Sequence, residues 1–173
     1  IQKGILNMND TYYEQLVTCK PTGKTALLRV LSFLPILILI LFGFPFLGFF
    51  AFMLAALYAV LAYYFIFPRF NVEYEYDLLN HELDIAAIYS KANRKDKLSI
   101  DIQHAEIIAP KNSHRLDSYH TTKRYDFSSG NANANTYAII ITLNQTLCTV
   151  LFDPDDEMLR HMKGWMGMKL FQD

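Results

Sequence analysis

Charged side chains are missing from a long stretch of this chain. From Val30 to Pro68 the sequence runs for 39 residues without an Asp, Glu, Lys or Arg. Because an α-helix rises about 1.5 Å per residue, one helix over this stretch would be about 58 Å long, whereas the hydrocarbon core of a bilayer is only ~30 Å thick. Tilting cannot absorb a difference of that size. The length therefore predicts two membrane spans.

Glycine and proline gather near the middle of the uncharged stretch, in Gly43-Phe-Pro-Phe-Leu-Gly48. We expect a turn there, with a first span at 26–42 and a second at 48–67, each close to the usual ~17–25 residues. Pro35 lies inside the first span and should kink it or mark a local weakness. Two alternatives fit less well. The first alternative is a signal peptide, but its apolar core is usually only about 7–15 residues long. The second is a buried helix pair of a soluble protein, but such helices normally keep a polar stripe, and none is visible here.

Lysine and arginine flank the uncharged stretch on both sides and are absent from the expected turn. Positively charged flanks stay in the cytoplasm. We therefore expect a multi-pass protein of the inner (cytoplasmic) membrane with both termini in the cytoplasm. Met8 begins a sequence typical of a cytoplasmic start, so residues 1–7 are interpreted as an upstream extension or a cloning remnant.

Cysteine is also scarce, since Cys19 and Cys148 are the only two. A disulfide framework is therefore not expected, in agreement with a reducing cytoplasm. Basic residues are not in excess: residues 1–69 carry a net charge of +3 and residues 70–173 a net charge of −4. The acidic second part argues against nucleic-acid binding, which requires a basic face. The basic first part suits the headgroup region of a membrane.

Strand patterns begin directly after the uncharged stretch. Val72, Tyr74 and Tyr76 alternate with acidic residues, which predicts a half-buried antiparallel strand at 72–78. The segment 91–96 is interpreted as a basic loop. Further strands are expected at 83–89, 98–102, 105–109, around 119–127, at 137–143 and at 147–152, the last two forming a hairpin across Asn144-Gln145.

A helix should end the chain. Asp153-Pro154-Asp155-Asp156 supplies a cap, a proline for the first helical position and acidic residues for the first turn, so we expect Asp153 to be the N-cap. Apolar residues then recur at helical spacing and should cover the open end of the sheet; they are Met158, Leu159, Met162, Trp165, Met166 and Leu170.

The order of elements resembles that of the bacterial PH-like membrane proteins. The residues that carry this resemblance are NVEYEYDLLNHELDIAAIYSKANRKDKLSIDI and the closing DPDDEMLRHMKGW, and MNDTYYEQLV resembles the start of a family of short bacterial two-helix membrane proteins. The resemblance implies an α+β membrane protein with a PH-like antiparallel β-barrel or sandwich of six to seven strands and a C-terminal amphipathic helix. Three parts are then expected: a cytoplasmic segment 1–25, a transmembrane helical hairpin 26–68 and a cytoplasmic PH-like domain 70–173. Neither a catalytic residue nor a ligand follows from the resemblance.

Catalytic and cofactor motifs are weak. Lys20-Pro-Thr-Gly-Lys-Thr25 ends like a nucleotide-binding P-loop, but the glycine required five positions before Gly23 is Thr18. His114 and His120 share a polar stretch with Asp117 and Asp126, without the close ligand spacing of a metal site. We therefore expect no enzyme activity, no cofactor and no metal.

Binding surfaces are easier to suggest. Six basic residues are candidates for contact with anionic lipid, at ~1 kcal/mol each near the membrane surface: Lys91, Arg94, Lys95, Lys97, Lys111 and Arg115. Ala55, Ala59 and Ala62 suit close packing of helices, and Trp165 is a candidate for partner docking. The low-complexity tract 128–135 is interpreted as a loop that could order on a partner.

The sequence therefore favours a non-enzymatic, membrane-anchored interaction or assembly module, whose partners would be the lipid bilayer and either a second copy or another membrane protein. An anionic-lipid or small-ligand-binding module is the alternative, and a membrane-associated enzyme is a remote one.

Overall fold

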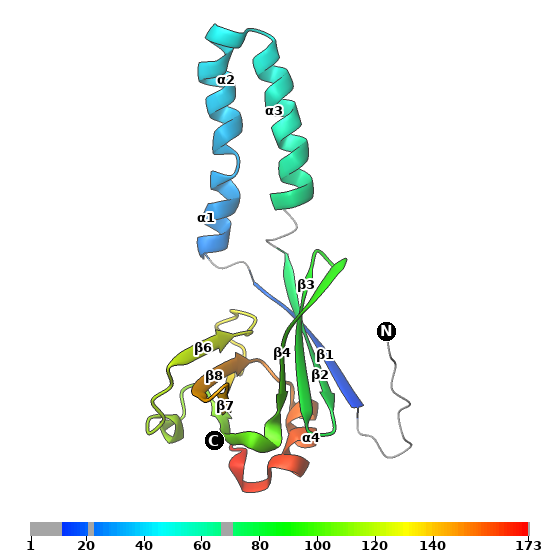
Figure 1. The fold of residues 1–173 in the computed structure, drawn as a ribbon, viewed down its shortest axis with the longest axis vertical. Helices are drawn as coiled ribbons and strands as arrows, with labels where there is room; N and C mark the ends of the chain where they lie inside the picture. Colours follow the sequence, from blue (N-terminus) through cyan, green and yellow to red (C-terminus); the bar gives the residue numbers. More distant parts are fainter. Residues whose placement is uncertain (1–11, 21–22, 67–70, 173) are drawn as a thin grey trace.

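The computed structural model describes residues 12–20, 23–66 and 71–172. Two β-sheets and a C-terminal helix lie together, and two apolar helical limbs leave from one end of the first sheet (Figure 1). The limbs are inserted between the first and second strands, so the sheet is built from residues on both sides of the uncharged stretch.

The first sheet has four strands in the order β1-β2-β3-β4, all antiparallel. They are β1 (Tyr12–Thr18), β2 (Val72–Leu79), β3 (Glu82–Tyr89) and β4 (Asn93–Asp101). The sequence predicts 1–25 as a segment separate from the domain, whereas β1 pairs with β2 from Glu73 to Leu79; residues 1–11 lie outside the described part of the chain. The expected basic loop 91–96 is largely strand, because β4 already begins at Asn93.

The second sheet has the strand order β5-β7-β8-β6. It consists of β5 (Ala105–Pro110), β6 (Lys123–Asp126), β7 (Tyr137–Leu143) and β8 (Thr146–Phe152). The expected hairpin across Asn144-Gln145 is confirmed, and both turn residues have positive φ (48° and 62°), as a tight two-residue β-hairpin turn requires. β6 pairs with β8 in parallel and is shorter than the expected strand 119–127.

The two sheets do not close into a barrel. Within the described residues, β1 and β4 are the edges of one sheet, and β5 and β6 are the edges of the other. The expectation of six to seven strands was also low, because β1 was missed and the described part of the chain contains eight. Short 3₁₀ turns connect the remaining segments, at Ile102–His104, His114–Leu116 and Gly167–Lys169.

The terminal helix α4 (Asp156–Met166) covers the core as expected. Met158, Leu159, Met162, Met166 and Leu170 are buried, whereas Trp165 remains 42% exposed. The helix begins two residues later than the pattern suggested: Asp155 is the N-cap, and its Oδ1 accepts a hydrogen bond from the Met158 N–H at 2.8 Å. Asp153 cannot cap the helix because its carboxylate binds Ser129 instead.

The apolar limbs consist of α1 (Gly23–Leu31), which begins before the uncharged stretch, α2 (Leu34–Leu47), α3 (Phe50–Leu61) and a π-helical turn, η1 (Ala62–Ile66). The helix is interrupted beside Pro35: α1 and α2 separate at Ser32-Phe33, and Pro35 stands in the first turn of α2. The turn between the limbs was placed too early. Pro45 stays inside α2, and the chain reverses at Gly48-Phe49, where Gly48 has a φ of 56°.

One helix is long and apolar enough to cross a membrane by length and composition. This helix is counted from Ala26 to Leu47, through α1, the turn at Ser32-Phe33 and α2. It is 22 residues long and has a mean hydropathy of 2.6, and none of its most apolar window is buried in the protein. The helix Phe50–Ile66 is apolar but shorter, and it lies antiparallel beside α2 (Figure 1). Phe67, the end of the second expected span, lies outside the described residues.

The two sheets are joined by a buried polar contact. The Tyr76 hydroxyl donates to the Phe127 carbonyl oxygen at 2.6 Å and accepts from the Asp153 N–H at 3.3 Å, and the Tyr76 ring packs edge-to-face on Phe152. Burial raises the pKa of Tyr76 far above its usual value, so the hydroxyl stays protonated and remains a donor. A strand of the first sheet thereby satisfies backbone groups at the end of the second.

Replacing Tyr76 with Phe should destabilise the fold by about 1–3 kcal/mol, because the Phe127 carbonyl and the Asp153 N–H would then be buried without partners. Urea unfolding of the full chain in mild detergent measures this change. Tyr12→Phe is the matched control, since the Tyr12 hydroxyl binds Glu14 at the surface, and it should stay within ~0.5 kcal/mol of the parent. Equal unfolding midpoints for the two variants would contradict the assigned role of Tyr76.

Candidate functional site at the helix-proximal end

Several connections meet at the end of the domain from which the limbs leave. The Asn71 carbonyl accepts from the Ser90 N–H at 2.8 Å, and the Asn71 side-chain oxygen accepts from an Arg29 N–H of α1 at 3.3 Å. The Lys20 N–H donates to the Ser129 carbonyl at 2.8 Å. We call this region the helix-proximal end. It comprises Cys19, Lys20, Asn71, the β3–β4 turn 90–92 and the loop 127–136.

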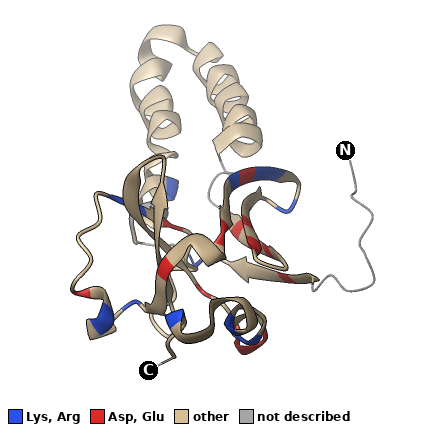
Figure 2. Cartoon of the chain, turned by 60° about the horizontal axis from the view of Figure 1, so that its bottom comes forward, with Lys and Arg blue, Asp and Glu red and all other residues tan. Residues whose placement is uncertain are grey.

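Three lysines stand on the β3–β4 hairpin beside the start of the limbs, and we call them the basic hairpin: Lys91, Lys95 and Lys97. All three are exposed, and the basic colouring of the hairpin lies just below the helices in Figure 2. Ser90 and Lys91 have φ values of 48° and 58°, which indicates a tight turn formed without glycine. The Lys97 ammonium lies 5.5 Å from the centre of the Tyr89 ring. Cationic groups are thus presented at the end of the domain from which the limbs leave.

The other three predicted lipid-contact residues lie elsewhere. Arg94 faces the outer surface of the first sheet and binds Glu75, Asp77 (2.7 Å) and Asp96 (3.1 Å). The hydrogen bond to Glu75 is the main reason that the pKa of Arg94 is raised. Lys111 lines a separate cavity, and the Arg115 guanidinium lies 4.0 Å from the centre of the Phe171 ring. The structure therefore keeps only part of the predicted set together.

The outer surface of the first sheet carries a row of carboxylates. In register across three strands lie Glu14, Asp77 and Asp84. Burial, followed by the nearby Glu75 carboxylate, raises the pKa of Asp77 to about 6, although Arg94 acts in the opposite direction. Like charges directly opposite one another destabilise a sheet. Arg94 therefore offsets only part of the repulsion in this row.

Metal-type donors come together at one place among the described residues. Oxygens of Glu14, Glu75 and Asp77 lie within 4.8 Å of one another, but the Arg94 guanidinium is bound to two of these residues. The Arg94 guanidinium therefore already balances part of the negative charge of this cluster. In the polar stretch that the sequence analysis weighed as a metal site, His114 lies 3.2 Å from Asp117, and both side chains are exposed. The sequence expectation of no metal stays a prediction.

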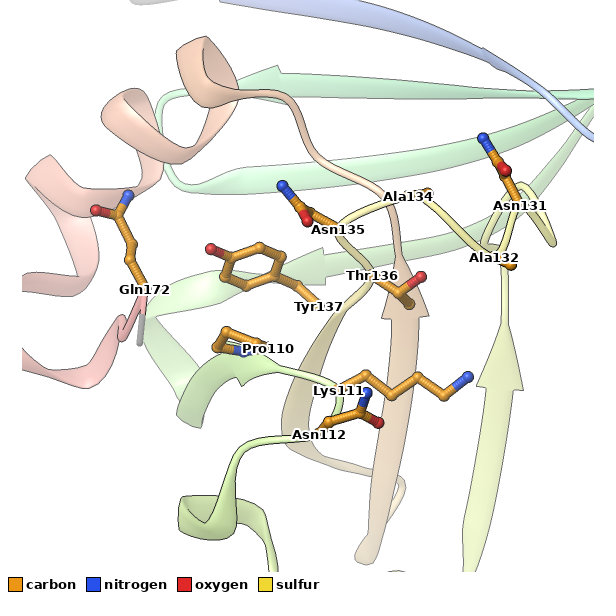
Figure 3. Close-up of a pocket in the computed structure, with 10 residues that line it drawn as sticks. All are labelled: Pro110, Lys111, Asn112, Asn131, Ala132, Ala134, Asn135, Thr136, Tyr137 and Gln172. Atoms are coloured by element: carbon orange, nitrogen blue, oxygen red, sulfur yellow. The ribbon is translucent and has the colours of Figure 1, made fainter.

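A polar cavity of about 350 Å³ lies beside the loop 127–136 (Figure 3). In Figure 3, Lys111 and Asn112 lie on one side, Asn135 and Tyr137 on another, and Asn131 farther along the loop. The remaining lining residues are Pro110, Ala132, Ala134, Thr136 and Gln172. The lining contains amides, two hydroxyls and one ammonium, but no carboxylate, imidazole or thiol side chain. It therefore supplies groups that bind a small polar molecule, and Lys111 and Tyr137 are its titratable side chains.

The loop beside the cavity is anchored at its start. The Ser129 N–H and hydroxyl both donate to Asp153 Oδ2, at 2.8 and 2.5 Å, and both residues are buried. The Lys20 ammonium donates to Asn131 Oδ1 at 3.0 Å. The tract 128–135, which the sequence marked only as low complexity, is thus connected to the end of β1. Nothing in its composition indicated that Asp153 and Lys20 would hold it.

The predicted packing and docking residues separate. Ala55 and Ala62 are buried, Ala59 is exposed, and Ala51, which the prediction missed, is fully buried. A Cβ added at Gly43 would lie 3.4 Å from that of Ala51, so these small residues serve the close approach of α2 and α3 within one chain. Trp165 packs edge-to-face on His81, 5.6 Å between ring centres, away from the helix-proximal end.

Asp77→Asn should stabilise the fold at neutral pH by ~1–2 kcal/mol. Because the folded-state pKa of Asp77 lies above its ordinary value of 3.8, the folded protein holds this proton more tightly than the unfolded chain. The resulting stability is complete below about pH 4 and is lost as the pH rises through 6. The gain from the variant should therefore vanish near pH 4, as measured by urea unfolding at each pH. Glu82→Gln on the same surface is the control, and an equal gain at both pH values for Asp77→Asn would contradict the assignment.

The sequence was compared with models of known protein families. Residues 9–172 match the family described as "Bacterial PH-like domain (DUF6106)". Comparisons with curated proteins and with solved structures each found no match. The matched range includes β1, both helical limbs and the terminal helix, and two sheets with a C-terminal helix agree with the PH-like description. The chain therefore belongs to this bacterial PH-like domain family.

Proposed function

We propose that this protein is a non-enzymatic, membrane-anchored interaction module whose PH-like domain is held against the bilayer surface. The observation that carries the proposal is the insertion of the apolar limbs between β1 and β2, two paired strands of one sheet. A domain joined to a helix by one linker can swing. A domain joined through two neighbouring strands is restrained at both connections.

The insertion also supports a second membrane span. Because β1 and β2 pair with each other, both limbs start on the same side of a bilayer. If Ala26–Leu47 crosses the membrane, Phe50–Ile66 must cross back. That helix would rise about 26 Å, slightly less than the ~30 Å hydrocarbon core, a mismatch that local thinning absorbs at modest cost. Its exposed Tyr63 and Tyr64 would then lie at the interface, where aromatic residues are enriched.

Cysteine labelling of membranes from the producing bacterium tests this arrangement. In a Cys19→Ser, Cys148→Ala background, single cysteines replace Phe49 at the turn between the limbs and Ala92 on the β3–β4 hairpin. An impermeant maleimide should label Ala92→Cys only in inverted vesicles and Phe49→Cys only in intact spheroplasts. Labelling of both positions from the same face, or release of the protein by alkaline carbonate, would overturn the proposed anchoring.

A second candidate function is recognition of anionic headgroups by the basic hairpin. The supporting observation is the hydrogen bond between Ser90 in the hairpin turn and Asn71, which is itself bound to Arg29 of α1. This geometry keeps Lys91 close to the point where the limbs leave the domain. Three lysines at ~1 kcal/mol each would bias the hairpin toward an anionic surface.

A fluorophore on Ala92→Cys of the full chain, reconstituted into vesicles, measures this contact. Its emission should shift to shorter wavelength more in phosphatidylcholine–phosphatidylglycerol than in phosphatidylcholine alone. Lys91→Glu with Lys95→Glu should remove the difference, whereas Arg160→Glu with Lys163→Glu, the same charge change on α4, should leave it. Identical emission in both lipid mixtures would exclude the headgroup contact without affecting the anchoring.

A further inference from the structure

A groove of about 460 Å³ runs along the outer edge of β1. One wall is the second half of β1 with Lys20, and the other is formed by the loop at Ser129–Asn135 and by the connection from β8 to α4. This connection contributes Asp153, Pro154, Asp155 and Asp156. The groove is distinct from the cavity of Figure 3, although Asn131, Ala134 and Asn135 line both.

The edge of β1 along this groove has unused backbone groups. The Cys19 N–H points to β2, where it donates to the Val72 carbonyl, and the next N–H, of Lys20, points away from β2 to Ser129. Because backbone groups alternate sides along a strand, those of Leu16 and Thr18 also point away from β2. Within the described residues, no hydrogen bond occupies the backbone of Leu16 or Thr18 on that side.

Direct hydrogen bonds join the two walls at both ends of the groove. At one end the Gln15 side chain donates to the Asp153 carbonyl and accepts from the Asp155 N–H, both at 3.0 Å. At the other end Lys20 binds Ser129 through its backbone and Asn131 through its ammonium. Between Gln15 and Lys20 the strand advances about 17 Å, enough for an extended segment of ~4 residues. Leu16 and Thr18, between these two contacts, are exposed, so this stretch of the edge is open and has a fixed length.

The charge of the groove indicates which segment fits it. Asp153, Asp155 and Asp156 face a single lysine, Lys20. Asp155 already accepts from the Tyr13 hydroxyl and the Met158 N–H, but Asp153 Oδ1 is buried and has no hydrogen-bond partner among the described residues. An unpaired buried acceptor costs about 1–3 kcal/mol. A lysine or arginine side chain would therefore meet a net negative wall.

We propose that the β1 edge binds an extended segment of a partner protein by strand addition, with a Lys or Arg side chain of that segment directed to the Asp153–Asp156 wall. Main-chain hydrogen bonds to Leu16 and Thr18 supply the pairing, and the carboxylates supply the selectivity. A second copy of the same edge is a poorer occupant, because it would place one acidic wall against another. The inference rests on the proposed interaction role and names the chemistry of its partner.

Synthetic peptides test the groove with the full chain in mild detergent. The probe is acetyl-VTKV-amide, whose length matches the open stretch of about four residues, and its control has Glu in place of Lys. Amide hydrogen exchange should slow at Leu16 and Thr18 as the Lys peptide is added, with half-saturation on the order of 1 mM or below, and the Glu peptide should bind at least ~10-fold more weakly. Unchanged exchange at both amides, or equal effects of the two peptides, would overturn the proposal.

Matched variants separate strand addition from a general charge effect. Thr18→Pro removes an outward N–H that β2 does not use and should abolish peptide binding, whereas Thr18→Ala should retain it. Asp156→Lys in the groove should weaken binding of the Lys peptide ~10-fold, while Glu157→Lys, which lies outside the lining, should not. Full binding by both Thr18→Pro and Asp156→Lys would overturn the assignment to this groove.

The same sample distinguishes the remaining outcomes. Exchange at Leu16 and Thr18 that slows with protein concentration instead of peptide would assign the edge to a second copy and overturn the proposed partner. The labelling of Phe49→Cys and Ala92→Cys does not depend on the groove. Failure of the labelling with intact peptide binding removes the anchoring alone, and failure of peptide binding with intact labelling removes the groove alone.

Discussion

The pairing of β1 with β2 is the constraint on which the rest of this structure depends. It joins Tyr12–Thr18 to Val72–Leu79 across the entire apolar insertion. Closing a loop of ~50 residues costs entropy that grows only with the logarithm of its length, so seven paired residues and a helical insertion with its own contacts can offset it. Once β1 is in place, the Tyr13 hydroxyl donates to Asp155 at 2.5 Å. The Gln15 side chain binds the backbone of Asp153 and Asp155, just before α4 begins. The hydrogen bond to Asp155, with burial, raises the pKa of Tyr13 to about 12.

The fold places the basic side chains of the β3–β4 hairpin on different surfaces of the domain. The basic hairpin stands at the end where the limbs leave, while Arg94, only a few positions away, turns to the opposite surface and binds Glu75, Asp77 and Asp96. Alternation along β4 and the bulge in the β3–β4 pairing decide which basic side chains face which surface. A cluster of like residues in the sequence is therefore divided between two roles, one structural and one available for binding. Buried Asp153 plays a further structural part by anchoring the loop at Ser129.

Much of the fold could be read from local patterns, and the failures have identifiable causes. The alternation from Val72 and the Asn144-Gln145 turn predicted their strands because half-buried strands and tight turns leave short-range signals. Tyr12–Thr18 was missed because its partners lie beyond the apolar stretch. Asp153, the cap that the pattern predicts, binds Ser129 instead, and Asp155 caps the helix. Pro45 was taken as part of a turn, yet it stays inside α2 and the chain reverses only at Gly48.

The sequence by itself determined the apolar character of the limbs, the basic residues that flank them and the presence of a small β domain with a terminal helix. These properties follow from composition and periodicity, which act over a few neighbouring residues. Only the tertiary structure decided that the limbs lie inside the domain, that Asp77 sits among carboxylates with a raised pKa, and that Leu16 and Thr18 face an acidic groove. Each depends on residues brought together from distant positions, and long-range pairing leaves no periodic trace in the chain.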